Sequence, residues 1–328
     1  MRLSLGLLSF FLVSLNCGIA GAQDCKPPVL LNTIQMEPMA GGNAMLVPFT
    51  INDSPRKLLL GTGGASTQLS QSAVLSLNLA PQGGGLHPLT NQWATRWGQF
   101  VTAHDVTLGR LHETDMRFEV NPNPLWGFKG RPYDGLVSDD LLLRYDFDVD
   151  FGNNTINLFS QDHCPGKIPD WKADKVAAVP VDIKKRVYLF VSVILDGKKV
   201  TAVIDTGIAD TTMRTIRARR YFDLEKESSD PSVDIPGFPP MVGQIHTFSS
   251  LSFGDVTVKN ARVTITRYKS SEDELFHGVP QNEPDLILGM NVLKYLHLYV
   301  APKEEKLYVS AASPVPKVEE NDKAAPKP

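Results

Sequence analysis

Two short segments of the chain differ at the one position where acid–base chemistry needs a carboxylate. Residues 203–209 read VIDTGIA, so an apolar stretch ends at Asp205. Residues 59–65 read LLGTGGA, and Gly61 stands at the corresponding place, 144 positions earlier (61 and 205). A positioned carboxylate can accept or donate a proton in a reaction, whereas glycine cannot. We therefore expect Asp205 to be the catalytic carboxylate and Gly61 to mark a degenerate catalytic position.

The residues that flank this carboxylate are those that would hold it in a tight turn. Residues 203–204 predict a buried strand, and Gly207 permits close approach of the backbone. The hydroxyl of Thr206 can donate and accept hydrogen bonds toward a partner loop. The first segment has the same residue types at the matching positions, Thr62 and Gly63. The first loop is thus predicted to keep its geometry and to lose its chemistry.

The similarity between the two segments extends along the chain, which indicates an internal duplication. Further blocks match in the same order: 47–52 with 191–196, 106–110 with 251–255, 134–138 with 285–289, and 147–154 with 297–304. Most segments alternate with period two between Gly, Pro, Asn and Asp breaks, which is typical of strands.

The duplication and the strand pattern predict an all-β chain of two domains, with few and short helices. The first domain is expected over 30–165 and the second over 178–311, with a disordered Pro-, Ala-, Lys- and Glu-rich tail over 313–328. A helical pattern spans 211–224, and its arginines are expected on a solvated face.

The N-terminus predicts export to the periplasm or the extracellular space. Residues 1–22 have a basic start, an apolar run and small residues before the end, as secretory signals do. Removal of this signal also removes Cys17 and leaves Cys25 and Cys164. An even pair of cysteines in an exported chain favours a disulfide bond, and the alternative is two unpaired thiols.

Composition and motifs exclude several other functions. The net charge of −3 and the isoelectric point near 6.2 suggest neither a nucleic-acid partner nor an anionic membrane surface. No stretch after the signal is long and apolar enough to span a membrane. The seven histidines show no metal-ligand spacing, and no phosphate-binding loop or nucleophile elbow is present. We therefore expect no metal and no cofactor.

Residues 205–207 (DTG), followed by residues 286–289 (LILG), resemble the retropepsin-like aspartic proteases. The tandem arrangement is similar to exported two-lobe members of that family in bacteria. The resemblance implies two β-barrel lobes in a pepsin-like bilobal arrangement. The first copy departs from the family pattern at Gly61, and also at Ser138, where the second copy has Gly289.

The resemblance also implies roles for the loops. Thr62 and Thr206 are expected to hold the two loops together by reciprocal hydrogen bonds. Flaps over the site are expected near 83–98 and 229–244.

Two functions follow from the resemblance, and a third reading does not need it. The first is an aspartic-type endopeptidase that hydrolyses peptide bonds with water activated by Asp205. The family uses two carboxylates that share one proton. Gly61 therefore leaves the dyad of a single chain incomplete. An active site would need a partner such as Asp205 of a second chain in a homodimer.

The alternative is a pseudoprotease that binds an extended peptide or unfolded protein segment between the lobes without cutting it. The third reading is a structural β protein in which 205–207 is an ordinary turn. Whether the chain is an enzyme stays open at this stage.

Overall fold

The computed structural model describes residues 26–39, 43–64, 66–81, 87–90, 95–121, 133–184, 188–224, 232–235, 241–268 and 284–312. The predicted signal over 1–22, Cys25 and the predicted tail over 313–328 lie outside these ranges. Among the helices of the described residues, none has the length and apolar character needed to cross a membrane.

The first lobe is a six-stranded β-barrel. Its strands follow the order β3 (Met45–Ile51), β4 (Ser54–Leu60), β10 (Gly135–Val137), β5 (Gln68–Ser70), β9 (Leu111–Asn121) and β8 (Phe100–Leu108). Pairing between β3 and β8 closes the barrel.

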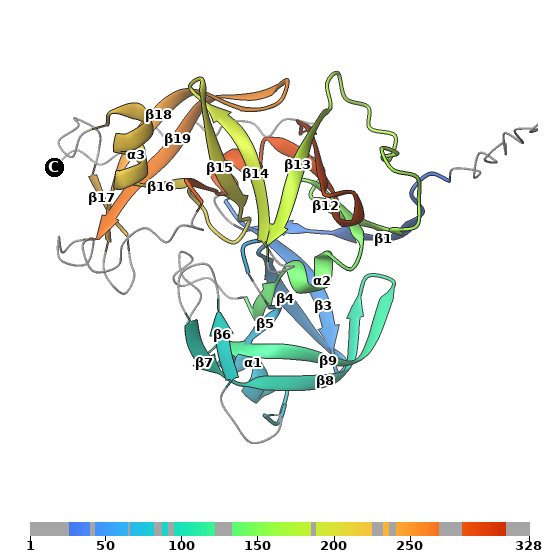
Figure 1. Cartoon of the computed structure of the whole chain (residues 1–328). Coiled ribbons are helices and arrows are strands. Elements are labelled where there is room, and N and C mark those ends of the chain that lie inside the picture. Colours follow the sequence, from blue (N-terminus) through green and yellow to red (C-terminus); the bar gives the residue numbers. More distant parts are fainter. Residues whose placement is uncertain are drawn as a thin grey trace, which may run out of the picture.

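The second lobe is a six-stranded β-barrel with the same order of equivalent strands. The order is β14 (Tyr188–Leu195), β15 (Lys198–Ile204), β20 (Leu286–Leu288), β16 (Thr212–Arg214), β19 (Val256–Tyr268) and β18 (Met241–Phe253). Pairing between β14 and β18 closes it. The expected all-β fold with two barrel lobes is confirmed. Figure 1 shows the first barrel at the bottom of the view and the second above it.

Strand formation follows the period-two pattern of apolar residues. In β14, Val191, Val193 and Leu195 are buried, while Ser192 and Ile194 between them are exposed. Because successive side chains of a strand point to opposite faces, this pattern lines one face with β-branched and aliphatic side chains. That face lies in a hydrophobic core cluster that also contains residues of the first barrel, among them Phe118.

A third set of strands joins the lobes. It runs β1 (Leu30–Gln35), β12 (Thr155–Phe159), β11 (Asp146–Asp150), β21 (Leu296–Ala301), β22 (Lys306–Ala311) and β13 (Ala177–Lys184). The strands in the last pair of matched sequence blocks, β11 and β21, are antiparallel neighbours. The lobes are therefore linked through backbone hydrogen bonds as well as through the chain.

Buried polar side chains reinforce this shared sheet at the junction between β11 and β21. The Tyr299 hydroxyl donates to Asp146 Oδ2 at 2.8 Å, and His297 Nε2 lies 2.8 Å from Asp148 Oδ1. Burial is the main cause that raises the pKa of Asp146 above its usual value. Because each pair crosses from one lobe's strand to the other's, these contacts fix the relative position of the lobes.

Short elements complete the fold. They are β2 (Glu37–Pro38), α1 (Gln71–Ser76), β6 (His87–Thr90), β7 (Thr95–Gly98), α2 (Asp139–Leu142), α3 (Thr215–Phe222), β17 (Ser232–Ile235), α5 (Met290–Leu293) and η1 (Pro302–Glu304). The segments expected to be flaps contain antiparallel hairpins, β6 with β7 and β17 with the start of β18.

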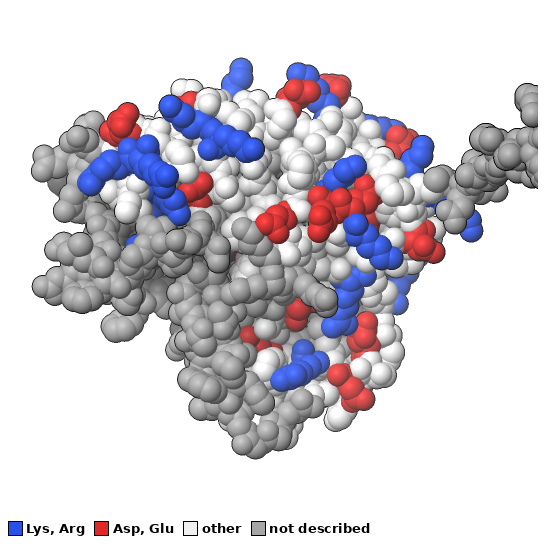
Figure 2. Space-filling model, in the orientation of Figure 1, with Lys and Arg blue, Asp and Glu red and all other residues white. Residues whose placement is uncertain are grey.

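The helix predicted over 211–224 begins later than expected. Residues 212–214 form β16 instead, because they pair in parallel with β19 and antiparallel with β20. The helix itself is α3, and it ends before Asp223, which adopts a left-handed conformation. Figure 2 shows Lys and Arg side chains gathered where α3 lies. Arg219 and Arg220 are exposed as expected, whereas Arg217 is mostly buried and forms an ion pair with Asp285 at 3.3 Å.

Candidate active site between two loops

Two equivalent loops meet between the barrels. We name residues 61–64 the first loop and residues 205–208 the second loop. The first loop follows β4, which pairs in parallel with β10, and the second loop follows β15, which pairs in parallel with β20. Each loop thus leaves the same point of its own barrel.

The first residue of each loop is fixed by the same backbone hydrogen bond. The amide of Gly61 donates to the carbonyl of Val137 at 2.9 Å. The amide of Asp205 donates to the carbonyl of Leu288, also at 2.9 Å. Positions 61 and 205, matched in the sequence, are therefore equivalent in space as well.

Four buried hydrogen bonds, which we name the threonine clasp, hold the loops face to face. The hydroxyl of Thr62 donates to the carbonyl of Ile204 at 3.0 Å, and that of Thr206 donates to the carbonyl of Leu60 at 2.9 Å. Each threonine amide donates to the other hydroxyl, at 3.1 Å from Thr62 and 3.2 Å from Thr206. The reciprocal bonds that the resemblance implied are present, and both partners belong to one chain.

The carboxyl group of Asp205 lies in this junction. Asp205 is 7% exposed, and its Oδ1 accepts a hydrogen bond from the amide of Gly207 at 2.9 Å. Gly63 of the first loop packs against it: a Cβ atom at position 63 would overlap the carboxyl carbon and lie 2.6 Å from Oδ1. A Cβ atom at position 207 would lie 3.3 Å from the Cα of Gly61. The glycines let the two loops approach this closely.

The space beside Gly61 is filled by Leu136 of β10. A Cβ atom at position 61 would overlap Cδ1 of Leu136 and lie 2.9 Å from its Cγ. In the second barrel the equivalent residue of β20 is Ile287, which is paired with Val203 as Leu136 is paired with Leu59. Position 61 is therefore packed against hydrocarbon, which the sequence analysis did not predict.

Ser138 and Gly289 differ because their surroundings differ. A Cβ atom on Gly289 would lie 2.6 Å from the backbone carbonyl carbon of Asp210, so no side chain fits there. In the first lobe the hydroxyl of Ser138 lies against Gly64, where a Cβ atom would overlap it. The departure from the family pattern at Ser138 thus accompanies the small residue at position 64.

A threonine in each lobe ties the strand end to the short helix behind the loop. The hydroxyl of Thr67 accepts from the amide of Ser138 at 3.1 Å and donates to Asp140 Oδ1 at 2.7 Å. The same pair of contacts recurs in the second lobe among Thr211, Gly289 and Asn291. The two lobes therefore support their loops by equivalent contacts.

Two residues near the loops were missed by the sequence analysis. Asp139, the first residue of α2, is fully buried, and this burial together with the negative charges of Asp205 and Asp140 holds its pKa well above the usual range. Burial also raises the pKa of Tyr188 in β14 to about 12, with smaller contributions from Asp205, Asp139 and Glu119. The signal available in the sequence was the residue after the matched block 134–138, which is Asp in the first copy and Met in the second.

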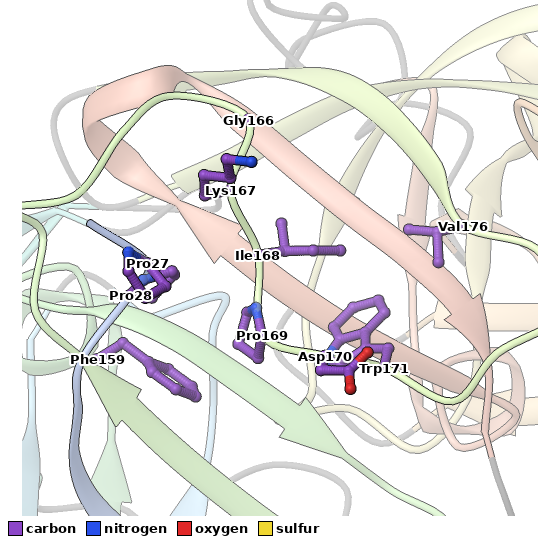
Figure 3. Close-up of a pocket in the computed structure, with 10 residues that line it drawn as sticks. All are labelled: Pro27, Pro28, Phe159, Gly166, Lys167, Ile168, Pro169, Asp170, Trp171 and Val176. Atoms are coloured by element: carbon purple, nitrogen blue, oxygen red, sulfur yellow. The ribbon is translucent and has the colours of Figure 1, made fainter. Parts of the chain in front are cut away.

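Other expected or candidate sites lie apart from the loops. Cys164 is disulfide-bonded, and its predicted partner Cys25 lies outside the described residues. Within the described ranges, no three His, Cys, Asp or Glu side chains are grouped to hold a metal ion. A pocket of about 570 Å³ is lined by the linker between the lobes, where Ile168 and Trp171 lie along it, and by Phe159 (Figure 3). Since it includes no residue of either loop, it is separate from the candidate site.

One of two comparisons with known proteins gave a match. A comparison with curated proteins found no match. Residues 191–292, which run from β14 to α5 and include Asp205 and its loop, match the family model for aspartyl proteases.

Proposed function

We propose that the chain is an aspartic-type endopeptidase in which Asp205 activates the attacking water. The observation that carries this proposal is the threonine clasp, which holds the Asp205 carboxyl at the junction of two barrels. The hydrogen bond from the Gly207 amide orients this carboxyl, and an oriented base is what proton abstraction requires.

The chemistry can be followed atom by atom. Asp205 takes a proton from water while the water oxygen forms a bond to the carbonyl carbon of the peptide. The electrons of the carbonyl double bond move to its oxygen, and the resulting negative charge must be stabilised. The proton is then delivered to the amide nitrogen as the carbon–nitrogen bond breaks. A single carboxyl can perform the first and last proton transfers in succession, because it is ionised before the first and protonated before the last.

Both loops of the proposed site belong to one chain. In a homodimer dyad, Asp205 of a second chain would have to replace the first loop opposite Asp205. That exchange would break the four bonds of the threonine clasp, and the tether between the lobes favours their reassembly. We therefore expect the working form to be a monomer.

A second candidate function is a pseudoprotease that binds extended peptide or unfolded protein segments without cutting them. The observation that favours it is Leu136, whose side chain takes the place in which a carboxylate at position 61 would begin. Peptides would bind by strand addition at a sheet edge. Binding would then persist when Asp205 is replaced.

Export is part of the proposal in either case. A disulfide at Cys164 suits an oxidising compartment. The amide of Cys164 donates to the carbonyl of Lys26 at 3.2 Å, which brings Cys164 next to the residue that follows Cys25. We propose a Cys25–Cys164 bond and a periplasmic or extracellular location, to be checked by mass spectrometry of the non-reduced exported protein.

Incubation of the monomeric mature protein with an unfolded protein substrate separates the two functions. Wild type should cleave, and Asp205→Asn should lower the rate by about three powers of ten or more while leaving the fold intact. Asp223→Asn is the matched control, because Asp223 is exposed and its left-handed conformation suits Asn. Binding without cleavage, equal in wild type and Asp205→Asn, would support the pseudoprotease instead.

A further inference from the structure

The buried carboxyl of Asp139 has no structural partner that explains it. Asp139 is 0% exposed, and neither of its carboxyl oxygens has a hydrogen-bond partner in the described part of the chain. The equivalent buried residue of the second lobe is Met290, at the start of α5. An apolar side chain is what such a position ordinarily holds, because an unpaired buried carboxylate is strongly destabilising.

The Asp205 carboxyl and the segment that carries Asp139 both border the first loop. The Asp205 carboxyl packs on Gly63, and Ser138, the neighbour of Asp139, packs on Gly64. The first loop contributes no side chain of its own at 61, 63 or 64 to separate the segments that carry these carboxyls. The second carboxyl of the region therefore comes from α2 rather than from the degenerate position.

The charges around Asp139 determine which carboxyl keeps a proton. The groups that interact with it are Asp205 from the second loop and Asp140 from α2, and Tyr188 from β14 and Glu119 from β9 lie in the same electrostatic neighbourhood. The charged groups among these are acidic. Burial, and after it the charges of Asp205 and Asp140, raise the pKa of Asp139. Asp139 is thus neutral under conditions in which an ordinary aspartate is ionised.

We propose that Asp139 is the second carboxyl of the site and that Asp139 and Asp205 together hold one proton, which rests on Asp139. The catalytic consequence of this carboxyl pair rests on the proposed peptidase function, whereas its titration can be measured without activity. Asp139 is a positioning residue, because its buried carboxyl acts through Asp205. While it is neutral, the pair carries one negative charge and Asp205 remains the base. Once Asp139 ionises, a second negative charge opposes the oxyanion that develops on the peptide carbonyl.

Carbon-13 NMR of aspartate-labelled protein tests the coupling without any need for activity. Asp139 should titrate above the pH range of ordinary aspartates. Asp205→Asn should move that titration to lower pH, because it removes the negative charge that opposes ionisation of Asp139. Asp139→Asn should leave the titration of Asp205 in place, because Asp139 is already neutral while Asp205 titrates. The control Asp53→Asn, at an exposed hairpin turn, should move neither.

Two outcomes would overturn the carboxyl pair, and a third would refute only the peptidase function. If the titration of Asp139 is unchanged in Asp205→Asn, the two carboxyls are independent and the proposal is overturned. Asp139→Met, which copies the second lobe, serves as a second variant for the Asp205 titration if Asp139→Asn does not fold. In protein that cleaves peptide, Asp139→Asn and Asp139→Met should each extend activity to higher pH. The acid limit of activity should stay with Asp205. Unchanged alkaline limits would also overturn the proposal. Coupled titration in protein that does not cleave would refute the peptidase function and leave the carboxyl pair standing.

Discussion

The first and second loops are held by the same backbone hydrogen bonds but have different side chains around them. Both begin with an amide bonded to the parallel neighbour strand, and both contribute one threonine to the clasp. Only the second loop carries a carboxyl, at Asp205, whereas Leu136 fills the corresponding space beside Gly61. The comparison teaches that strand pairing and the clasp hold such a loop whether or not its first residue carries a carboxylate.

The short helices behind the loops, α2 and α5, also differ, but here the acid lies in the first lobe. Asp139 in the first lobe is a buried acid, and Met290 in the second lobe is a buried hydrocarbon. The buried acid therefore stands in the short helix of the first lobe and in the loop of the second lobe. This arrangement is consistent with the carboxyl pair that we infer.

The largest expected loss of stability comes from adding a methyl group on the side of the loop that faces the carboxyl. In Gly63→Ala the new Cβ would overlap the buried carboxyl of Asp205, so we expect a loss of about 3 kcal/mol in the free energy of unfolding. In Gly207→Ala the nearest atoms lie 3.1 Å and 3.3 Å away, and about 1 kcal/mol is expected. Denaturant unfolding of both variants measures the difference, and a larger loss for Gly207→Ala would show that the loops are not related as described.

A smaller loss is expected when a carboxylate is restored to the first loop. Gly61→Asp alone must displace the side chain of Leu136 and should cost about 2 kcal/mol by overpacking. Leu136→Ala vacates that space, so the double variant should lose less stability than the two single variants added together. Peptide cleavage should rise more in the double variant than in Gly61→Asp alone. Additive losses of stability would mean that Leu136 does not occupy the place of the missing carboxylate.

The smallest effect, and the one that depends on pH, concerns Asp139. Its folded-state pKa is raised above the ordinary aspartate value of 3.8, mainly by burial. The stability from this group is fully present below that value and is lost as the pH rises toward the folded-state pKa. Asp139→Asn removes the titration, so its free energy of unfolding relative to wild type should increase from acidic to neutral pH. A difference that is constant over this range would contradict the raised pKa.

The sequence predicted the strands and the two loops better than the packing of side chains around them. Period-two alternation and the matched blocks predicted two β domains, and the family resemblance at Thr62 and Thr206 predicted the clasp. The strand at 212–214 was mistaken for helix because its pairing partners, β19 and β20, lie far away in the sequence. Local propensity cannot report such pairing.

The packing of the site was beyond what a pattern in the sequence can show. Leu136 is apolar, as a strand residue in a barrel should be, and nothing in its type says that its side chain turns toward position 61. Asp139 reads as an exposed acid at the start of a helix, because aspartate is rarely buried without a partner. Only the three-dimensional arrangement shows it fully buried and within the electrostatic influence of Asp205.

A double-mutant cycle on the threonine clasp tests most directly whether the two loops face each other in one chain. Thr62→Ala and Thr206→Ala each remove two buried hydrogen bonds and should each cost about 2–3 kcal/mol in the free energy of unfolding. Since loss of either hydroxyl loosens the same contact, the double variant should cost at least about 1 kcal/mol less than the sum of the single variants. Additivity within about 0.5 kcal/mol, in a monomer confirmed by light scattering, would contradict the account.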